Sequence, residues 1–121
     1  MRFVLIAAAL ALAAPAGAVE REKYQVRNTA DLVRICSTGA SAPDYASAIA
    51  FCHGILVGSY QFYDASRPAE GRSICSPSPT PSRAKVMNDF VAWANARPQY
   101  AQAHAVDTLF RYLAETYPCR K

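Results

Sequence analysis

Residues 45–63, which read YASAIAFCHGILVGSYQFY, form a run of 19 residues without Asp, Glu, Lys or Arg. Asp44 precedes the run and Asp64 follows it. Large side chains recur within it at steps of three and four, the spacing of one face of an α-helix. The run therefore predicts a buried central helix whose large apolar face is made of Tyr45, Ile49, Cys52, Leu56, Tyr60 and Tyr63.

A second stripe of the same run carries only small residues, at steps of four: Ala46, Ala50, Gly54 and Gly58. Each glycine inside a helix costs about 1 kcal/mol relative to alanine, so we expect another helix to pack closely against Gly54 and Gly58. Membrane helices also use small residues in this way. We favour a buried helix over a membrane span because the run contains the polar residues Ser47, His53, Ser59 and Gln61.

Three more helices are expected around the central one, and no stretch alternates as a strand would. Asn28-Thr29 can cap a helix, and Thr80-Pro81 reads as a cap followed by a first helical residue. The fold class is therefore all-α, a small four-helix domain with antiparallel neighbours. The expected helices span about 29–37, 45–63, 81–97 and 99–117.

The N-terminus has the features of a cleaved signal peptide, residues 1–18. A positive start precedes 12 apolar residues, and Ala16-Gly17-Ala18 fits a cleavage site after Ala18. The apolar run is shorter than the about 20 residues that a membrane span needs. We expect export to the periplasm and no membrane span after cleavage, with a loose segment at 19–28 and the helical domain at 29–119.

The four cysteines of an exported chain predict two disulfides, which sequence alone can pair in three ways. With antiparallel helices, Cys36 lies near Cys52, while Cys75 and Cys119 lie at the other end of the central helix. That helix is about 30 Å long, and a disulfide tolerates less than about 7 Å between Cα atoms. We expect the pairs Cys36–Cys52 and Cys75–Cys119.

No catalytic, metal or cofactor site is expected. The formal net charge of +4 is too mild and too evenly spread to indicate nucleic-acid binding. His53 and His104 lie far apart in sequence, the cysteines are committed to disulfides, and no known catalytic motif occurs. The sequence favours a binding protein over an enzyme.

The loop between Asp64 and Pro81 is the candidate binding element. Arg67, Glu70 and Arg72 lie in it, prolines limit its freedom, and a disulfide would hold Cys75. A rigid exposed loop loses little entropy when it docks. An ordinary connector is the alternative reading.

Several ordered motifs carry a family resemblance. Phe51-Cys52-His53-Gly54 with Gly58 is followed by Cys75-Ser76-Pro77, by Arg97-Pro98 and His104-Ala105, and finally by Tyr117-Pro118-Cys119. In these positions the chain resembles the Tai-type immunity proteins, over about residues 30–119. The proline-rich Ser78–Pro81 departs from the family pattern.

The resemblance implies a small helical periplasmic protein that inhibits a peptidoglycan amidase effector of the type VI secretion system. It also implies a possible homodimer. The motif residues are interpreted as scaffold: Phe51, Gly54, Gly58, Pro77, Pro98 and Pro118. The loop residues Arg67, Glu70 and Arg72 are hypothetical partner contacts. The alternative is a periplasmic acid-stress chaperone-like protein, or a binder of another partner, on the same scaffold.

Overall fold

The computed structural model describes residues 21–120. The predicted signal peptide, residues 1–18, and the first two residues of the expected loose segment lie outside the described residues.

Four α-helices make up the described part of the chain, which confirms the all-α prediction. The described residues contain no strand, only an isolated bridge between Ile74 and Pro118. Three short 3-10 turns complete the structure: η1 (Arg21–Tyr24), η2 (Ala69–Gly71) and η3 (Pro98–Tyr100). The helices are α1 (Thr29–Cys36), α2 (Tyr45–Ser66), α3 (Arg83–Asn95) and α4 (Ala105–Thr116).

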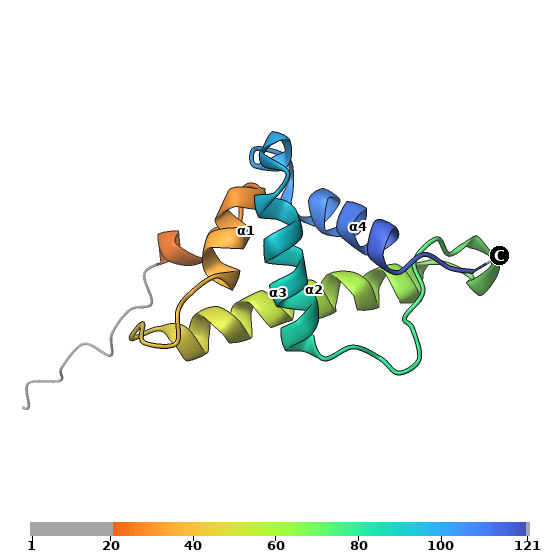
Figure 1. The fold of residues 1–121 in the computed structure, drawn as a ribbon, viewed down its shortest axis with the longest axis horizontal. Helices are drawn as coiled ribbons and strands as arrows, with labels where there is room; N and C mark the ends of the chain where they lie inside the picture. The colour runs from red at the N-terminus through yellow and green to blue at the C-terminus, as the bar shows by residue number, and fades with distance from the viewer. Residues whose placement is uncertain (1–20, 121) are drawn as a thin grey trace, which may run out of the picture.

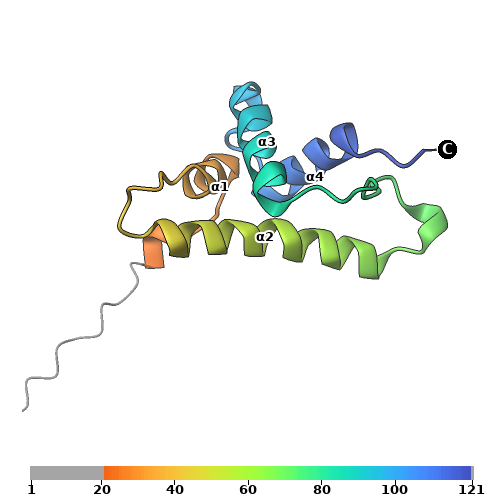
Figure 2. The ribbon, with the colours of Figure 1, turned by 60° about the horizontal axis from the view of Figure 1, so that its bottom comes forward.

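The long helix α2 forms a base on which the other three helices lie. Figure 1 shows α3 crossing α2 between α1 and α4, and Figure 2 shows α1, α3 and α4 all on one side of α2. The core lies between α2 and this layer, where the largest fully buried side chains are Leu32, Ile35, Phe90, Leu109 and Tyr112. One long face of α2 is consequently left without a helix against it.

The start of α1 docks on the connection between α3 and α4. The Asn28 side chain accepts a hydrogen bond from the Asp31 N–H, as its predicted capping role requires. The N–H groups of Thr29 and Ala30 donate to carbonyls of the connection, at 2.9 and 3.0 Å. The first N–H groups of a helix have no partner within it, so these contacts fix α1 against the rest of the domain.

Helix α3 begins at Arg83 rather than at the expected Pro81. Ser82, not Thr80, occupies the cap position, because its hydroxyl accepts a hydrogen bond of 3.1 Å from the Lys85 N–H. The expected helix at 81–97 therefore has its start two residues too early and its end two residues too late.

The expected helix at 99–117 is broken into η3 and the shorter α4. The core side of α4 includes the buried residues Thr108, Leu109 and Tyr112, whereas Val106 is 42 % exposed. Burial of Thr108 is tolerated because its hydroxyl pairs with the Thr29 hydroxyl at 2.8 Å.

The predicted close helix packing at Gly54 and Gly58 is wrong. A methyl group added at either glycine would meet no atom within 4 Å beyond the helix itself. The small residues instead lie on the open side of α2, beside the exposed rings of Phe51 and Phe62. No helix in the described part of the chain is long and apolar enough to cross a membrane.

Both predicted disulfides are confirmed. Cys36 and Cys52 are joined with a Cα separation of 5.3 Å, and Cys75 and Cys119 with one of 4.8 Å. The first bridge ties the end of α1 to the middle of α2. The second joins the segment after α2 to the C-terminal residues beyond α4.

The described part of the N-terminal segment, residues 21–28, packs against the start of α2, although a loose segment was expected. The Lys23 ammonium lies 2.6 Å from the Asp44 carboxylate, and the Tyr24 hydroxyl donates to the same carboxylate at 3.3 Å. The Tyr24 ring also lies 5.3 Å from the Phe51 ring.

Candidate functional site

Beyond the C-terminal end of α2 lies a short exposed segment, residues 67–72, which we call the tip. It includes the turn η2, and only Arg72 is partly buried within it. The tip lies at the same end of the molecule as the described C-terminal residues (Figure 1). Its sequence, RPAEGR, combines three charged side chains with a proline and a glycine.

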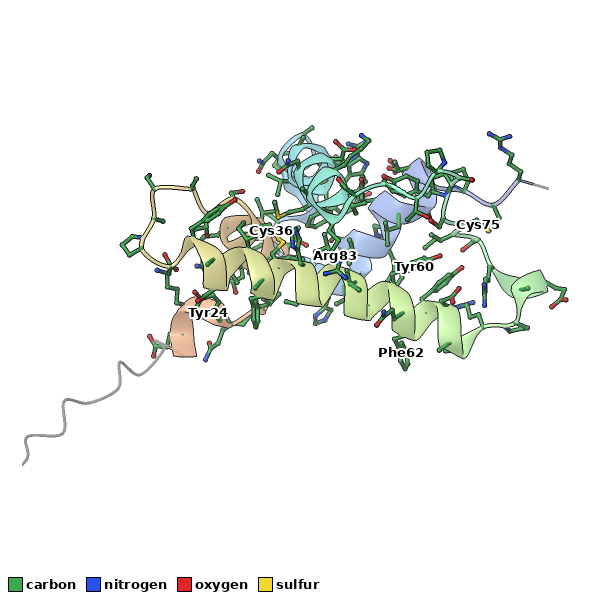
Figure 3. All side chains as sticks on the ribbon, turned by 90° about the horizontal axis from the view of Figure 1, so that it is seen from below. Tyr24, Cys36, Tyr60, Phe62, Cys75 and Arg83 are labelled. Atoms are coloured by element: carbon green, nitrogen blue, oxygen red, sulfur yellow. A yellow bond between two sulfur atoms is a disulfide. The ribbon has the colours of Figure 1, made fainter. Side chains whose placement is uncertain are left out.

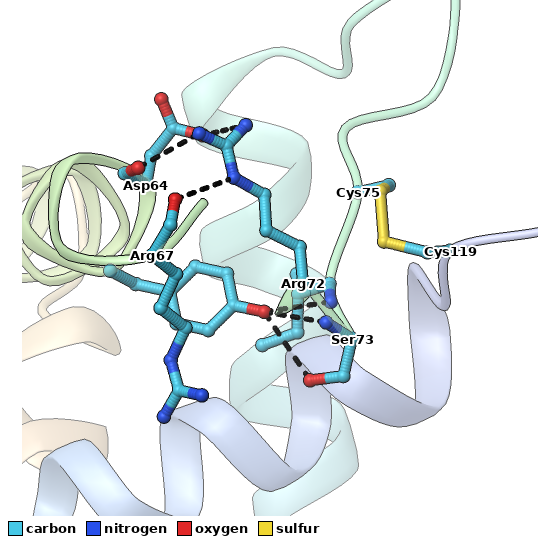
Figure 4. The surroundings of a disulfide bond; sticks show 8 residues. Asp64, Arg67, Arg72, Ser73, Cys75 and Cys119 are labelled. Carbon is cyan, nitrogen blue, oxygen red and sulfur yellow. Dashed lines mark hydrogen bonds and ion pairs between the residues drawn. A yellow bond between two sulfur atoms is a disulfide. The ribbon is translucent and has the colours of Figure 1, made fainter. Parts of the chain in front are cut away.

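A buried tyrosine of α2 holds the chain that leaves the tip. The Tyr63 side chain is 8 % exposed, and its oxygen accepts hydrogen bonds from the N–H groups of Ser73 and Ile74 at 2.7 and 3.1 Å. The Ser73 hydroxyl lies 3.3 Å from the same oxygen (Figure 4). Burial raises the pKa of Tyr63, but these hydrogen bonds outweigh it, so the pKa lies below its usual value.

Arg72 closes the tip back onto α2. Its guanidinium lies 2.7 Å from the Asp64 carboxylate and also donates to the Asp64 carbonyl at 2.9 Å. A third hydrogen bond of 3.3 Å reaches the Arg67 carbonyl (Figure 4). Three bonds from one rigid guanidinium to two backbone carbonyls and a carboxylate fix the shape of the tip.

The second disulfide and a small antiparallel bridge hold the base of the tip. The Cys75 N–H donates to the Tyr117 carbonyl at 2.9 Å, and the Cys119 N–H donates to the Ser73 carbonyl at 3.1 Å. The bridge residue Pro118 lies between these two bonds. The tip is thus a rigid projection, anchored at its start by α2 and at its end by the C-terminal residues.

Two tip side chains remain available for a partner. Arg67 lies with its guanidinium 5.3 Å from the Tyr63 ring and is exposed. Glu70 is exposed and makes no hydrogen bond or ion pair with another described residue. Of the three hypothetical contacts, Arg67 and Glu70 display their charges, while Arg72 uses its charge within the protein.

A second surface is the open side of α2, which we call the outer face and define by Phe51, Gly54, Gly58 and Phe62. Phe62 is 75 % exposed and Phe51 37 % exposed. Figure 3 shows Phe62 pointing away from the layer of α1, α3 and α4. An exposed, uncharged strip of this kind is typical of an interaction surface.

The other motif residues and both histidines lie elsewhere. Pro77 lines a cavity after Cys75, and Pro98 opens η3. His104 is the residue before α4 and its side chain does not cap the helix. His53 lies on α2, lining the same cavity as Pro77. Among residues 21–120, no group of His, Cys, Asp and Glu is placed to hold a metal ion.

The comparison with protein families gives one match. The family model described as Rap1a immunity proteins matches residues 28–119, which is most of the chain and includes all four helices, the tip and both disulfides. No curated protein and no solved structure matches the chain.

Proposed function

The chain belongs to the Rap1a immunity protein family, and we propose from this that it binds and inhibits a peptidoglycan amidase effector of the type VI secretion system. The family match over residues 28–119 carries the proposal. The amidase target is the part that the Tai-type resemblance of the sequence motifs supports. The protein then acts by binding, without a catalytic reaction of its own, in the periplasm, where such an effector attacks the cell wall.

The rigid tip is the element that we propose to contact the effector. A projection held by Tyr63, Arg72 and a disulfide loses little conformational entropy on binding. Its displayed charges, on Arg67 and Glu70, have opposite signs and can pair with opposite charges beside a catalytic cleft. We assign direct contacts to these two residues and a positioning role to Arg72.

The outer face of α2 is the surface that we propose for a homodimer. Its four defining residues are uncharged, and its two glycines, which line a hollow together with Arg27, leave room for a second backbone to approach. A two-fold interface needs one surface that is complementary to itself. When two copies of this strip pair antiparallel about its centre, the glycines of one copy face those of the other and Phe51 faces the Phe62 of the other copy. Analytical ultracentrifugation tests the assignment: we expect the wild type to sediment as a dimer and Phe62→Asp as a monomer. A monomeric wild type contradicts the proposal.

The function is tested first with the oxidised full chain as bait in secreted and periplasmic extracts of the source cells. We expect a stoichiometric complex with an amidase that loses its activity on peptidoglycan. A bait that captures no amidase, or an amidase that remains active in the complex, contradicts the proposal. Capture of many unrelated unfolded proteins would instead favour a chaperone.

The contact residues are tested with the captured amidase. We expect Arg67→Ala and Glu70→Ala to weaken inhibition without changing the melting temperature. Arg111→Ala is the matched control, because Arg111 also lies over a tyrosine ring, 5.4 Å from that of Tyr100, but is on α4. If the control and the two tip variants bind the amidase with equal affinity, the tip is not part of the interface.

A further inference from the structure

A cavity lies between α2, α4 and the segment that connects the tip to α3. Its volume is about 400 Å³, within the usual range of small-molecule sites. Figure 3 shows Tyr60 pointing from α2 toward this segment, opposite to Phe62. Neither the proposed effector contacts nor the outer face of α2 uses this cavity.

The lining is mostly apolar and is already formed. Residues of α2 and α4 face a wall made of the proline-rich segment, which departs from the family pattern. The Cys75–Cys119 disulfide fixes this wall at one end, and the Ser82 cap of α3 fixes it at the other. The principal apolar side chains are Leu56, Val57, Tyr60, Val86, Leu109 and Leu113.

The same lining contains polar groups without partners. Arg83 makes no hydrogen bond or ion pair with another described residue, unlike its neighbour Lys85, which lies 2.6 Å from Asp89. Nε2 of His53 and the Tyr117 hydroxyl are enclosed, and neither has a hydrogen-bond partner among the described residues. These two atoms are shielded from solvent, so the exposed and unpaired guanidinium of Arg83 is the charged group of the lining that a ligand can reach.

Size and charge together define the class of ligand. At about 30 Å³ for each water-sized group, a volume of 400 Å³ holds roughly a dozen such groups. The unpaired cation at Arg83, beside the positive N-terminal end of α3, favours an anion. We propose that the cavity binds a small amphipathic anion, a free fatty acid of about ten carbons whose carboxylate pairs with Arg83.

Calorimetric titration of the oxidised full chain with hexanoate, octanoate and decanoate tests the proposal. Each methylene transferred into an apolar cavity is expected to tighten binding about fourfold. Tetradecanoate exceeds the cavity and is expected to bind no tighter than decanoate. Affinity that does not depend on chain length, or no binding of decanoate up to its solubility limit, overturns the proposal.

The role of the ligand's carboxylate is tested separately from the role of its hydrocarbon chain. Arg83→Gln is expected to weaken decanoate about two- to fivefold, the effect of one exposed ion pair, and to leave decanol unchanged. Lys85→Gln is the matched control and is expected to affect neither ligand. A ten-carbon lysophosphatidylglycerol is expected to bind more weakly, because its carboxyl group is esterified. An equal loss of decanoate affinity in Arg83→Gln and Lys85→Gln contradicts the pairing of a free carboxylate with Arg83. Tighter binding of the lysolipid than of decanoate contradicts it as well.

The position of the bound fatty acid is tested with the wild-type protein, so the result does not depend on whether a variant folds. Intermolecular NOEs from decanoate are expected at the methyl groups of Val57, Val86 and Leu113, which line the cavity. NOEs confined to Phe51 and Phe62 would place the fatty acid on the outer face of α2 and overturn the assignment.

Discussion

Replacing Tyr63 by phenylalanine removes one oxygen and leaves two backbone N–H groups, those of Ser73 and Ile74, without their acceptor. Ile74 is 3 % exposed, so water does not easily replace the lost bond there, whereas Ser73 is exposed. An unsatisfied buried group costs about 1–3 kcal/mol. With one such group, we expect Tyr63→Phe to lower the free energy of unfolding by about 2 kcal/mol, or the melting temperature by about 8–16 °C.

Chemical denaturation of the oxidised protein measures this loss, and Tyr60→Phe is the control. Tyr60 lies on the same helix, and its hydroxyl makes no hydrogen bond with a described residue. Amide exchange at Ile74 is expected to accelerate in Tyr63→Phe alone. The reasoning is refuted if the two variants are equally stable and Ile74 exchanges at the wild-type rate in both.

Three further effects are expected. Replacing Cys75 and Cys119 by serine opens a loop with a sequence separation of 44 residues, and loop entropy predicts a loss of about 4 kcal/mol, which denaturation would measure; a loss below 1 kcal/mol would contradict the tethering role of this bridge. Hydrogen bonds from Arg27 lower the pKa of Asp31 below its unfolded value of 3.8, so its stabilisation is complete above that pH and is lost as the pH falls through the folded-state pKa. Asp31→Asn should therefore flatten the acid limb of a stability-versus-pH curve, and an unchanged limb would exclude this contribution. Gly58→Ala should stabilise the monomer by about 1 kcal/mol, because the added methyl group meets open space; destabilisation measured at a concentration where the protein is monomeric would show that the site is crowded.

The sequence could predict those parts of the fold that depend on local residue spacing or on the reach of the chain. The apolar spacing of residues 45–63 identified α2, and chain reach selected the pairing of Cys36 with Cys52. Helix ends were harder, because Thr80 and Ser82 are both good cap residues. Only the hydrogen bond to Lys85 distinguishes them, and the tertiary placement of the chain determines it.

The large side chains of α2 correctly predicted its covered side, since Cys52, Leu56 and Tyr63 are buried, but nothing in the uncharged run shows that the small-residue side lies open. Gly54 and Gly58 were therefore assigned to a helix contact that the fold does not make. The candidate site was located by its loop composition, but the roles within it were not separable. Arg67 and Arg72 look alike in sequence, and only the proximity of Asp64 shows that Arg72 is used to hold the tip.

The two disulfides divide the chain into covalent rings that share no residue, one closed at 36 and 52 and the other at 75 and 119. A protease that cuts inside either ring leaves all fragments joined through sulfur. A cut between 53 and 74 separates the chain into two pieces that only non-covalent packing holds together. The exposed tip lies in this interval, so the segment that we propose to contact a partner is also where a single cleavage divides the chain into two pieces with no covalent link.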